Sequence, residues 1–329
     1  MQSDVFQTTD RFGRRLGYLR LSLTPVCPMR CTYCRPALIN EEPAGETMLP
    51  ETIERLVRHL VSRWGITKVR LTGGEPTVRT DLVEIIERLA RIESLHDLAM
   101  TTNGLTLPHR ARSYREAGLR RVNISIDSLT PHIFERMTGV PGPARVIDGI
   151  HAAMEEGLGP VRLNTVVLAG ENDYELPDLV RFAAARGLDI RFIELMPMGP
   201  LADQWADRYV TAEVMRDRLN PIVRRWSAID QGHDSARRYR VTLDDGQEAV
   251  VGFITPMSCN FCAACDRLRI TAAGDVYPCL MDRPRGSLAE ALFPIFDPAR
   301  FDTLLTECLS QKAEEHPADG FTQMTILGG

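Results

Sequence analysis

The chain has 329 residues, of which 44% are hydrophobic and 25% are charged, and its formal net charge is −5. This composition is that of an ordinary globular protein, long enough for a barrel or for two domains. The negative balance disfavours a surface that coats nucleic acid, and no apolar run approaches the length of a membrane-spanning helix. We therefore expect neither nucleic acid nor a membrane as a partner, and any anion site must be a local concentration of arginine and lysine.

Strand-like and helical segments alternate between residues 18 and 195. Apolar runs predict strands at 18–23, 69–72, 98–102, 122–126, 161–168 and 190–195. Asp81 is expected to cap the second of the helical segments, which cover 52–63, 82–91, 109–117, 146–156 and 176–186. Repeated strand–helix units predict a parallel sheet, here an α/β fold with an incomplete TIM-like (βα)6 barrel. Functional groups are then expected at the carboxyl ends of the strands.

The pattern changes after residue 225. Strand-like runs at 239–243 and 248–254 flank the turn Asp244-Asp245-Gly246, which predicts a hairpin, and a second hairpin is expected around Ala273-Gly274-Asp275. We therefore expect residues 1–225 to form the partial barrel. Residues 226–329 are expected to form a smaller C-terminal α+β domain.

A short loop directly after the first expected strand holds Cys27, Cys31 and Cys34. Three thiolates at this spacing suit three corners of a 4Fe-4S cluster and leave one iron open. A structural zinc site is the alternative, but it needs a fourth ligand, and none lies close in sequence. With Tyr33 before the last cysteine, the run resembles the signature of radical S-adenosylmethionine (SAM) enzymes.

A second set consists of Cys262, Cys265 and Cys279, and the second expected hairpin would bring its members together. Zinc bound by four cysteines competes with a cluster here, because Cys259 is a spare candidate ligand. Cys308 is expected to be an inert core residue. Clustered thiols favour a reducing compartment, so a cytoplasmic location is expected.

Basic residues lie on or beside several expected strands. A cation on a central strand is costly to bury unless it meets an anion or lines a wet cavity, although each one alone can also point into solvent. If they converge on one cavity, their guanidinium groups could each bind a phosphate through two hydrogen bonds, which would suit a triphosphate ligand. The residues are Arg20, Lys68, Arg70, Arg162, Arg191, Arg267 and Arg269.

Taken together, the motifs resemble the GTP 3′,8-cyclases, the molybdenum cofactor biosynthesis protein A family of radical SAM enzymes. The likeness runs over nearly the whole chain, and it is the order and spacing of the motifs that make it specific. Besides the two cysteine sets, it is carried by the segments Leu19-Arg20-Leu21-Ser22, Thr72-Gly73-Gly74-Glu75-Pro76, Thr101-Thr102-Asn103-Gly104, Asn123-Ile124-Ser125-Ile126-Asp127, Arg191-Phe192-Ile193-Glu194, the run 261–271 and the terminal Gly328-Gly329.

The resemblance implies two 4Fe-4S clusters, each with an open iron, in a radical SAM barrel with a cluster-carrying C-terminal domain. It implies SAM contacts at Tyr33, Gly74, Ser125 and Met196. It implies GTP contacts at Arg20, Lys68, Arg70, Thr101, Arg162, Arg191, Arg267, Leu268 and Arg269. By the same resemblance, Arg267, Arg269, Gly328 and Gly329 take part in catalysis.

The implied activity is that of a lyase that converts GTP to (8S)-3′,8-cyclo-7,8-dihydro-GTP, the first step of molybdenum cofactor biosynthesis. Implied partners are an external one-electron reductant and a downstream cyclic pyranopterin monophosphate synthase, and the chain would act as a monomer or homodimer. Two alternatives stay open: another two-cluster radical SAM enzyme that modifies peptides, and a zinc-stabilised protein without catalytic activity.

This chain departs from the family pattern at a few positions. The first cysteine loop begins with Pro25-Val26-Cys27-Pro28, and Arg162 stands where lysine is frequent. Cys259 is additional, so whether it ligates the second cluster stays an open question.

Overall fold

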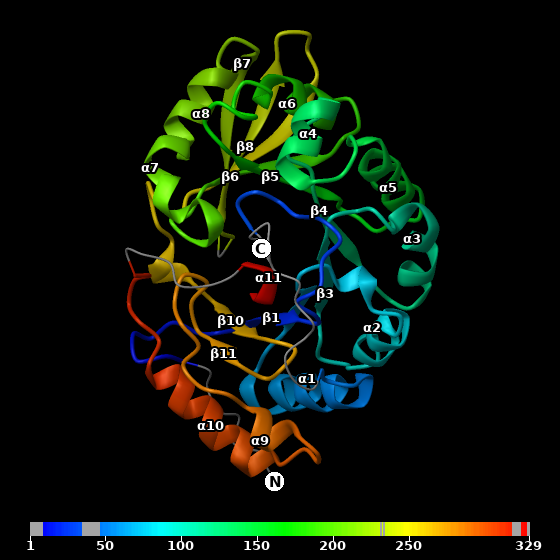
Figure 1. Ribbon diagram of the computed structural model, residues 1–329, viewed down its shortest axis with the longest axis vertical. Coiled ribbons are helices and arrows are strands. Elements are labelled where there is room, and N and C mark those ends of the chain that lie inside the picture. The colour runs from blue at the N-terminus through cyan, green and yellow to red at the C-terminus, as the bar shows by residue number, and fades with distance from the viewer. Residues whose placement is uncertain (1–8, 35–46, 231, 233, 318–323, 328–329) are drawn as a thin grey trace.

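A computed structural model describes residues 9–34, 47–230, 232, 234–317 and 324–327. Its strands form the inside of a ring, and most of its helices lie outside that ring (Figure 1). The short helix α11 (Met324–Leu327) lies near the centre of the ring in this view. The end of the described chain is therefore close to the first two strands, and Thr72 Oγ1 on the second strand donates to the carbonyl of Leu327 at 3.5 Å.

The expected parallel barrel is confirmed. Six strands pair side by side in chain order, all parallel: β1 (Tyr18–Ser22), β2 (Lys68–Thr72), β3 (Asp97–Thr102), β4 (Arg121–Ser125), β5 (Arg162–Val167) and β6 (Asp189–Glu194). The helices between them are α1 (Pro50–Trp64), α2 (Leu82–Ala90), α3 (Leu107–Glu116), α4 (Pro131–Thr138), α5 (Ala144–Glu155) and α6 (Leu176–Ala184). The helix α4 was not expected from the sequence.

The C-terminal strands extend the same sheet at both edges. β10 (Arg267–Ile270) lies parallel beside β1, and β9 (Glu248–Ile254) lies parallel beside β6. Antiparallel strands follow outward, β11 (Val276–Tyr277) on one side and β8 (Ala236–Leu243) with β7 (Val223–Ile229) on the other. Both expected hairpins are present, and the sheet has eleven strands in the described chain.

The remaining helices are short, apart from one that packs near α1. They are α7 (Trp205–Arg208), α8 (Ala212–Leu219), α9 (Ala289–Leu292) and α10 (Pro298–Ser310). Asp302 ties α10 to α1, because its Oδ1 accepts from Trp64 Nε1 at 2.7 Å and lies 2.6 Å from His59 Nε2. The 3₁₀ segments are η1 (Pro76–Val78), η2 (Gly199–Gln204) and η3 (Cys262–Ala264).

Side chains alternate between two environments along β1. Leu19 and Leu21 are fully buried in the hydrophobic core, while Tyr18 and Arg20 line a cavity inside the ring. The helix α1 contributes Ile53, Leu56, Val57, Leu60 and Trp64 to the same core, the spacing of an amphipathic helix. The apolar layer therefore lies between sheet and helices, and the inner face of the sheet is free to carry polar groups.

The expected cap at Asp81 is wrong. The Asp81 side chain makes no cap hydrogen bond to α2. Its carboxylate accepts instead from Arg79 Nε at 2.8 Å and Arg79 Nη2 at 2.7 Å. Arg79 in turn donates to the carbonyls of Leu23 at 3.1 Å and Met48 at 3.0 Å. A two-point bond to a guanidinium is stronger than a neutral cap, so this carboxylate stabilises the junction between β1 and α1.

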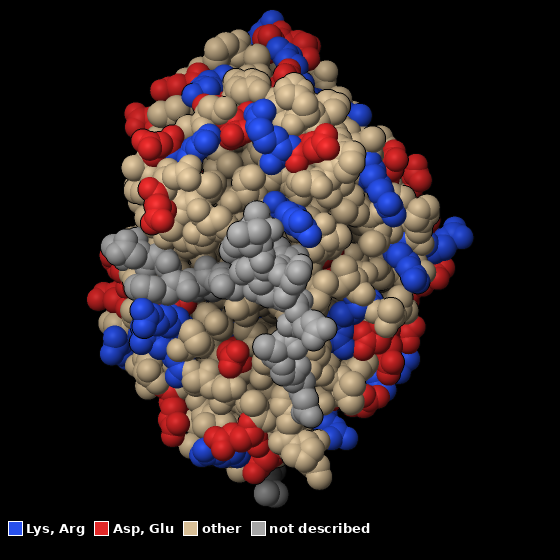
Figure 2. All heavy atoms as spheres, viewed as in Figure 1, with Lys and Arg blue, Asp and Glu red and all other residues tan. Residues whose placement is uncertain are grey.

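Acidic and basic side chains are interspersed on the face of the molecule shown in Figure 2. This distribution agrees with the small negative net charge of −5. In the described part of the chain, no helix has both the length and the apolar character required to cross a membrane.

Candidate active site

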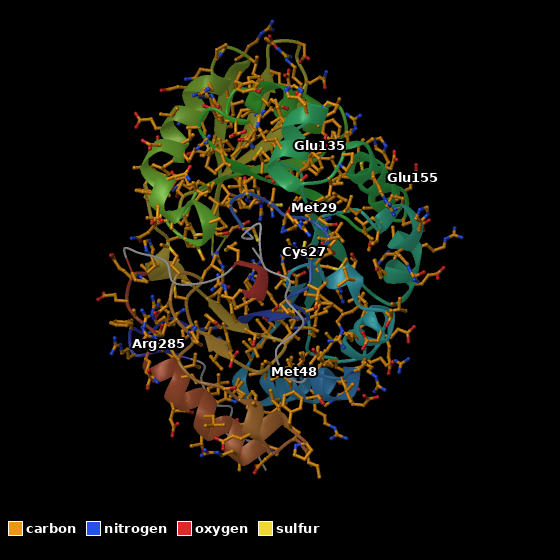
Figure 3. The ribbon with its side chains drawn as sticks, in the orientation of Figure 1. Cys27, Met29, Met48, Glu135, Glu155 and Arg285 are labelled. Carbon is orange, nitrogen blue, oxygen red and sulfur yellow. The ribbon has the colours of Figure 1, made fainter. Side chains whose placement is uncertain are left out.

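A cavity of about 520 Å³ opens inside the ring, and its lining comes from β1 to β6 and from the C-terminal strands. This volume is in the range of about 300–1,000 Å³ that is typical of small-molecule sites. Cys27 and Met29 lie on the loop that follows β1, over the centre of the ring (Figure 3). The expected position of the cysteine loop at the carboxyl ends of the strands is therefore what the structure shows.

Two glycines after β2 let this loop pack closely. The N–H of Gly74 donates to the carbonyl of Thr24 at 2.6 Å. A Cβ on Gly73 would lie 2.5 Å from that same carbonyl oxygen, and one on Gly74 would lie 2.5 Å from the carbonyl oxygen of Pro25. Larger residues cannot occupy these positions without moving the loop. The glycines are thus required by the neighbouring backbone, and they form part of the cavity wall as well.

Cys27, Cys31 and Cys34 all line the cavity. Burial raises the pKa of the Cys31 thiol well above its ordinary value, and Asp127, Cys34 and Cys27 raise it further. Three close thiols that are costly to ionise together favour a cationic partner, which an iron cluster supplies. The donor set fits a cluster that spreads its thiolates over three irons.

All four residues expected to contact SAM line the cavity, namely Tyr33, Gly74, Ser125 and Met196. The hydroxyl of Tyr33 donates to Asp127 Oδ2 at 2.7 Å. Burial raises the pKa of Asp127 to about 6, and the bonds from Tyr33 and from the N–H of Val166 act in the opposite direction. Sequence reasoning did not assign a role to Asp127, although it ends the motif that begins within β4.

The seven cations expected to converge do line this one cavity. Arg20 on β1 is aligned with Arg70 on β2 and with Arg269 on β10, so three guanidinium groups share one level of the sheet. Leu268 differs from its neighbours, because its side chain points to the opposite face of β10 and is fully buried in the core. Only its backbone is then available to a ligand.

Three of these cations, Arg70, Arg191 and Arg269, are almost fully buried, whereas Lys68 is exposed. Burial lowers the pKa of Arg20 to about 9 and that of Arg191 to about 10. Among the described residues, Nε of Arg70, Arg162 and Arg269 is buried without a hydrogen-bond partner. Buried donors of this kind are costly unless a ligand satisfies them. The site is therefore built for a polyanion.

Acidic residues that the sequence did not single out balance part of this charge. Asp97 accepts from Arg121 Nη2 at 2.5 Å, and Asp234 accepts from Arg191 Nη2 at 2.8 Å. All four side chains line the cavity. Arg121 is an eighth cation there, at the first position of β4, and strand alternation alone could have identified it.

Polar, uncharged groups also face the cavity. Thr101 Oγ1, Asn123 Oδ1 and Asn164 Oδ1 are buried without a hydrogen-bond partner among the described residues. Thr101 and Asn123 are aligned on β3 and β4. Such groups are suited to orient a base or a sugar beside the polyanion.

The second cysteine set lies beside this cavity. Burial raises the pKa of Cys262, and Cys279 and Cys265 raise it further. None of the three lines the cavity, although Arg267 and Arg269 do. Cys259 is exposed and contacts Arg237 Nη2. Cys308 is 3% exposed in the core, as expected.

The helix α11 brings the C-terminal segment to the site. Met324 lines the cavity, and Leu327 is 1% exposed. Gly328 and Gly329, the expected catalytic glycines, lie outside the described residues.

Comparisons with known proteins agree with this architecture. The Radical SAM superfamily matches residues 21–183. Among solved structures, Streptococcus suis SuiB bound to S-adenosylmethionine aligns with a TM-score of 0.58 at 18% identity, over 92% of this chain and 72% of that one. The protein anSMEcpe with bound AdoMet aligns with a TM-score of 0.53 at 14% identity, over 94% and 82% of the two chains. The fold and the cysteine loop define a radical SAM protein.

Curated relatives indicate which family of radical SAM proteins this chain is similar to. The Molybdenum Cofactor Synthesis C family matches residues 188–318. A GTP 3′,8-cyclase of Erythrobacter litoralis is 39% identical over 311 residues, 93% of this chain and 92% of that protein. A GTP 3′,8-cyclase of Pelotomaculum thermopropionicum is also 39% identical, over 97% and 99% of the two chains. The chain belongs to the GTP 3′,8-cyclase family.

Proposed function

We propose that this chain converts GTP to (8S)-3′,8-cyclo-7,8-dihydro-GTP and thereby catalyses the first step of molybdenum cofactor biosynthesis. The single observation that carries the proposal is the cavity itself, which is lined by the three-cysteine loop and by cations from both halves of the chain. Membership of the cyclase family supports the same substrate.

The triphosphate occupies the cationic wall. Arg20, Arg70 and Arg269 form its aligned centre, and Arg162 and Arg191 extend it along β5 and β6. Guanidinium groups bind phosphate oxygens by two parallel hydrogen bonds, which fixes the orientation of the nucleotide as well as its position. Lys68 and Arg267 complete the set at the amino-terminal ends of β2 and β10.

Cys27, Cys31 and Cys34 would hold the first 4Fe-4S cluster, and Tyr33, Gly74, Ser125 and Met196, which line the same cavity, would hold SAM. When bound, the cluster and SAM supply the one-electron chemistry that opens the reaction at C3′ of the ribose. The protein orients the reacting parts: Asp127 fixes Tyr33 through their 2.7 Å hydrogen bond, and the closely packed glycines fix the loop. A geometry held in this way lowers the entropic part of the barrier to joining C3′ and C8.

Cys262, Cys265 and Cys279 would hold the second 4Fe-4S cluster, which would bind the guanine base. The side chains of Arg267 and Arg269 point from β10 into the cavity next to it. The Arg267 guanidinium lies 4.9 Å from the centre of the Phe261 ring, an interaction that holds it in place. Gly328 and Gly329, which lie outside the described residues, are proposed to take part in catalysis.

The organisation into residues 1–225 as barrel and 226–329 as cluster-binding and substrate-binding domain is part of this proposal. The proposal also includes a cytoplasmic location and an external one-electron reductant. It includes transfer of the product to a cyclic pyranopterin monophosphate synthase, and a monomeric or homodimeric state.

Anaerobic turnover with dithionite, SAM and one nucleoside triphosphate at a time tests the function. We expect a cyclised product from GTP and none from ATP, CTP or UTP. SAM cleavage without cyclised product from GTP would overturn the substrate while leaving the radical SAM class intact. Protein that carries zinc in place of iron and sulfide after anaerobic purification would overturn the enzyme itself.

A further inference from the structure

The chain contains only two lysines among its 39 basic residues, Lys68 and Lys312. Lys68 lines the cavity. Lys312 lies elsewhere, just after α10, and its side chain is almost fully buried, with the residue 2% exposed. A lysine that is removed from water to this degree needs partners that compensate its charge.

The partners of Lys312 all lie in the segments that carry the second cysteine set. Its Nζ lies 3.9 Å from Cys265 Sγ and donates to the carbonyl of Arg267 at 3.3 Å. It also donates to the carbonyl of Pro278, the residue directly before Cys279. One ammonium group therefore links the segment that follows Cys265 to the segment that ends at Cys279.

Arg14 fixes the chain on the other side of Lys312. Its Nη1 donates to the carbonyl of Cys262 at 3.0 Å and to that of Glu314 at 2.7 Å, while its Nη2 donates to the carbonyl of Ala313 at 2.6 Å. Asp10 holds Arg14 through an ion pair of 2.6 Å. The residues that follow Lys312 are thus tied to the remaining cysteine of the set, and Lys312 has little freedom to move away.

We propose that Lys312 is a positioning residue for the second cluster, which sets the geometry of Cys265 and Cys279 and stabilises the reduced, more negative state of the cluster. The inference rests on the proposed function, because it requires the second cluster to be present.

The expected effect of Lys312 on the cluster follows from its charge. A cluster gains one negative charge when it is reduced, and a fixed cation close to a ligating sulfur lowers the free energy of that state. Burial strengthens the effect, because little water lies near to screen it. Arginine is less suited to this position, since a compact ammonium can direct its three donors to three acceptors that do not share a plane.

The test isolates the second cluster in the full chain by changing Cys27, Cys31 and Cys34 to serine. In this background, Lys312→Met is compared with the parent and with Lys312→Arg, which keeps the charge. Iron and sulfide are measured first, and the midpoint potential of the cluster is then measured by anaerobic titration with dithionite, followed by electron paramagnetic resonance. We expect a lower midpoint potential in Lys312→Met and a value near the parent in Lys312→Arg.

A second measurement needs no destabilising change. Because the chain has two lysines, growth on ¹⁵N-lysine labels two side chains only. We expect a weak ¹⁵N coupling to the reduced second cluster that persists in Lys68→Arg and disappears in Lys312→Arg. This readout decides the question even where Lys312→Met fails to retain its cluster.

Three results would overturn the inference. An unchanged midpoint potential in fully loaded Lys312→Met excludes the electrostatic role, and a missing ¹⁵N coupling in the parent excludes the contact. A parent variant without iron would overturn the second cluster of the proposed function and the role of Lys312 with it, whereas the first two results leave the proposed function intact.

Discussion

Arg20 on β1 and Arg269 on β10 occupy aligned positions on neighbouring parallel strands, and both side chains face the cavity. Arg269 is 4% exposed. Like charges side by side on a sheet destabilise it, and the burial of a charged group adds to that cost. The pair is therefore a source of instability in the ligand-free protein that a bound triphosphate removes.

We expect Arg269→Met to raise the melting temperature of the ligand-free protein and to weaken GTP binding. The change removes a buried guanidinium whose Nε has no hydrogen-bond partner among the described residues. Loss of a charged hydrogen bond worth about 1.5–3 kcal/mol corresponds to roughly 10- to 100-fold in affinity. Thermal unfolding and calorimetric titration with GTP measure the two effects. Arg240→Met, which removes an exposed arginine 3.8 Å from Glu248, is the matched control, and equal effects from both variants would contradict the prediction.

Gly74→Ala is expected to displace the first cysteine loop. The added Cβ would lie 2.5 Å from the carbonyl oxygens of Pro25 and Val26, which are backbone atoms with little freedom to move. We expect a loss of about 1–3 kcal/mol in unfolding free energy and a reduced iron content. Gly17→Ala is the control, because no atom lies within 4 Å of the Cβ that it adds. Full iron loading of Gly74→Ala, together with unchanged SAM cleavage, would show that the close approach is not required.

Asp127 is expected to make the stability of iron-free protein depend on pH. Its pKa is raised from 3.8 to about 6, chiefly by burial, so the native state holds the proton more tightly than the unfolded state. The stability that this provides is fully present below pH 3.8 and is lost as pH rises through about 6. At neutral pH the unfolding free energy is therefore about 3 kcal/mol lower than at acid pH, because each unit by which the pKa is raised is worth about 1.4 kcal/mol.

Asp127→Asn should remove this dependence, because the amide is neutral and can still bond to Tyr33 and to the N–H of Val166. Urea unfolding of iron-free protein across the acid range checks it, with Asp207→Asn at an exposed position as the control. We expect the stabilising effect of Asp127→Asn to be largest at neutral pH. The prediction fails if the stability difference between variant and parent is the same at pH 4 and pH 7.

Asp234→Asn is expected to strengthen GTP binding. Its carboxylate accepts from Arg191 Nη2 at 2.8 Å and faces the same cavity, so it both competes for a guanidinium and repels phosphate. Removal of the charge is worth about 1 kcal/mol or a little less, a gain of up to about fivefold in affinity at low salt. Calorimetric titrations at two salt concentrations test this, with the exposed Asp245→Asn as the control. Weaker binding would instead show that Asp234 positions Arg191 for the substrate.

Much of the barrel could be predicted from the sequence, because its signals are local. Apolar runs bounded by turn residues located six parallel strands, and the glycine-containing turns located both hairpins. The seven cations could be named because charge on a central strand is unusual wherever it occurs. The convergence of the five cations on β1, β2, β5 and β6 follows from strand order and alternation, whereas that of Arg267 and Arg269 depends on where β10 lies.

The parts that could not be predicted depend on contacts between distant segments. Nothing near β10 in the sequence indicates that it lies beside β1, so the alignment of Arg20 with Arg269 was out of reach. The sequence assigns no role to Asp127, because its hydrogen bond to the distant Tyr33 becomes evident only in the structure. Asp81 was misread as a cap because Arg79, two residues before it, offered a stronger partner that a capping rule does not consider.

The pairing of β1 with β10 also constrains how the molecule is made. Tyr18 has Arg267 as its neighbour on one side, so one edge of the first strand stays open while most of the chain is still being synthesised. An open parallel edge is a template for unwanted pairing with other chains. The binding wall formed by Arg20 and Arg269 is also complete only once β10 has been translated. A ribosome-bound chain that ends before β10 therefore lacks the side of the cavity that Arg267 and Arg269 provide.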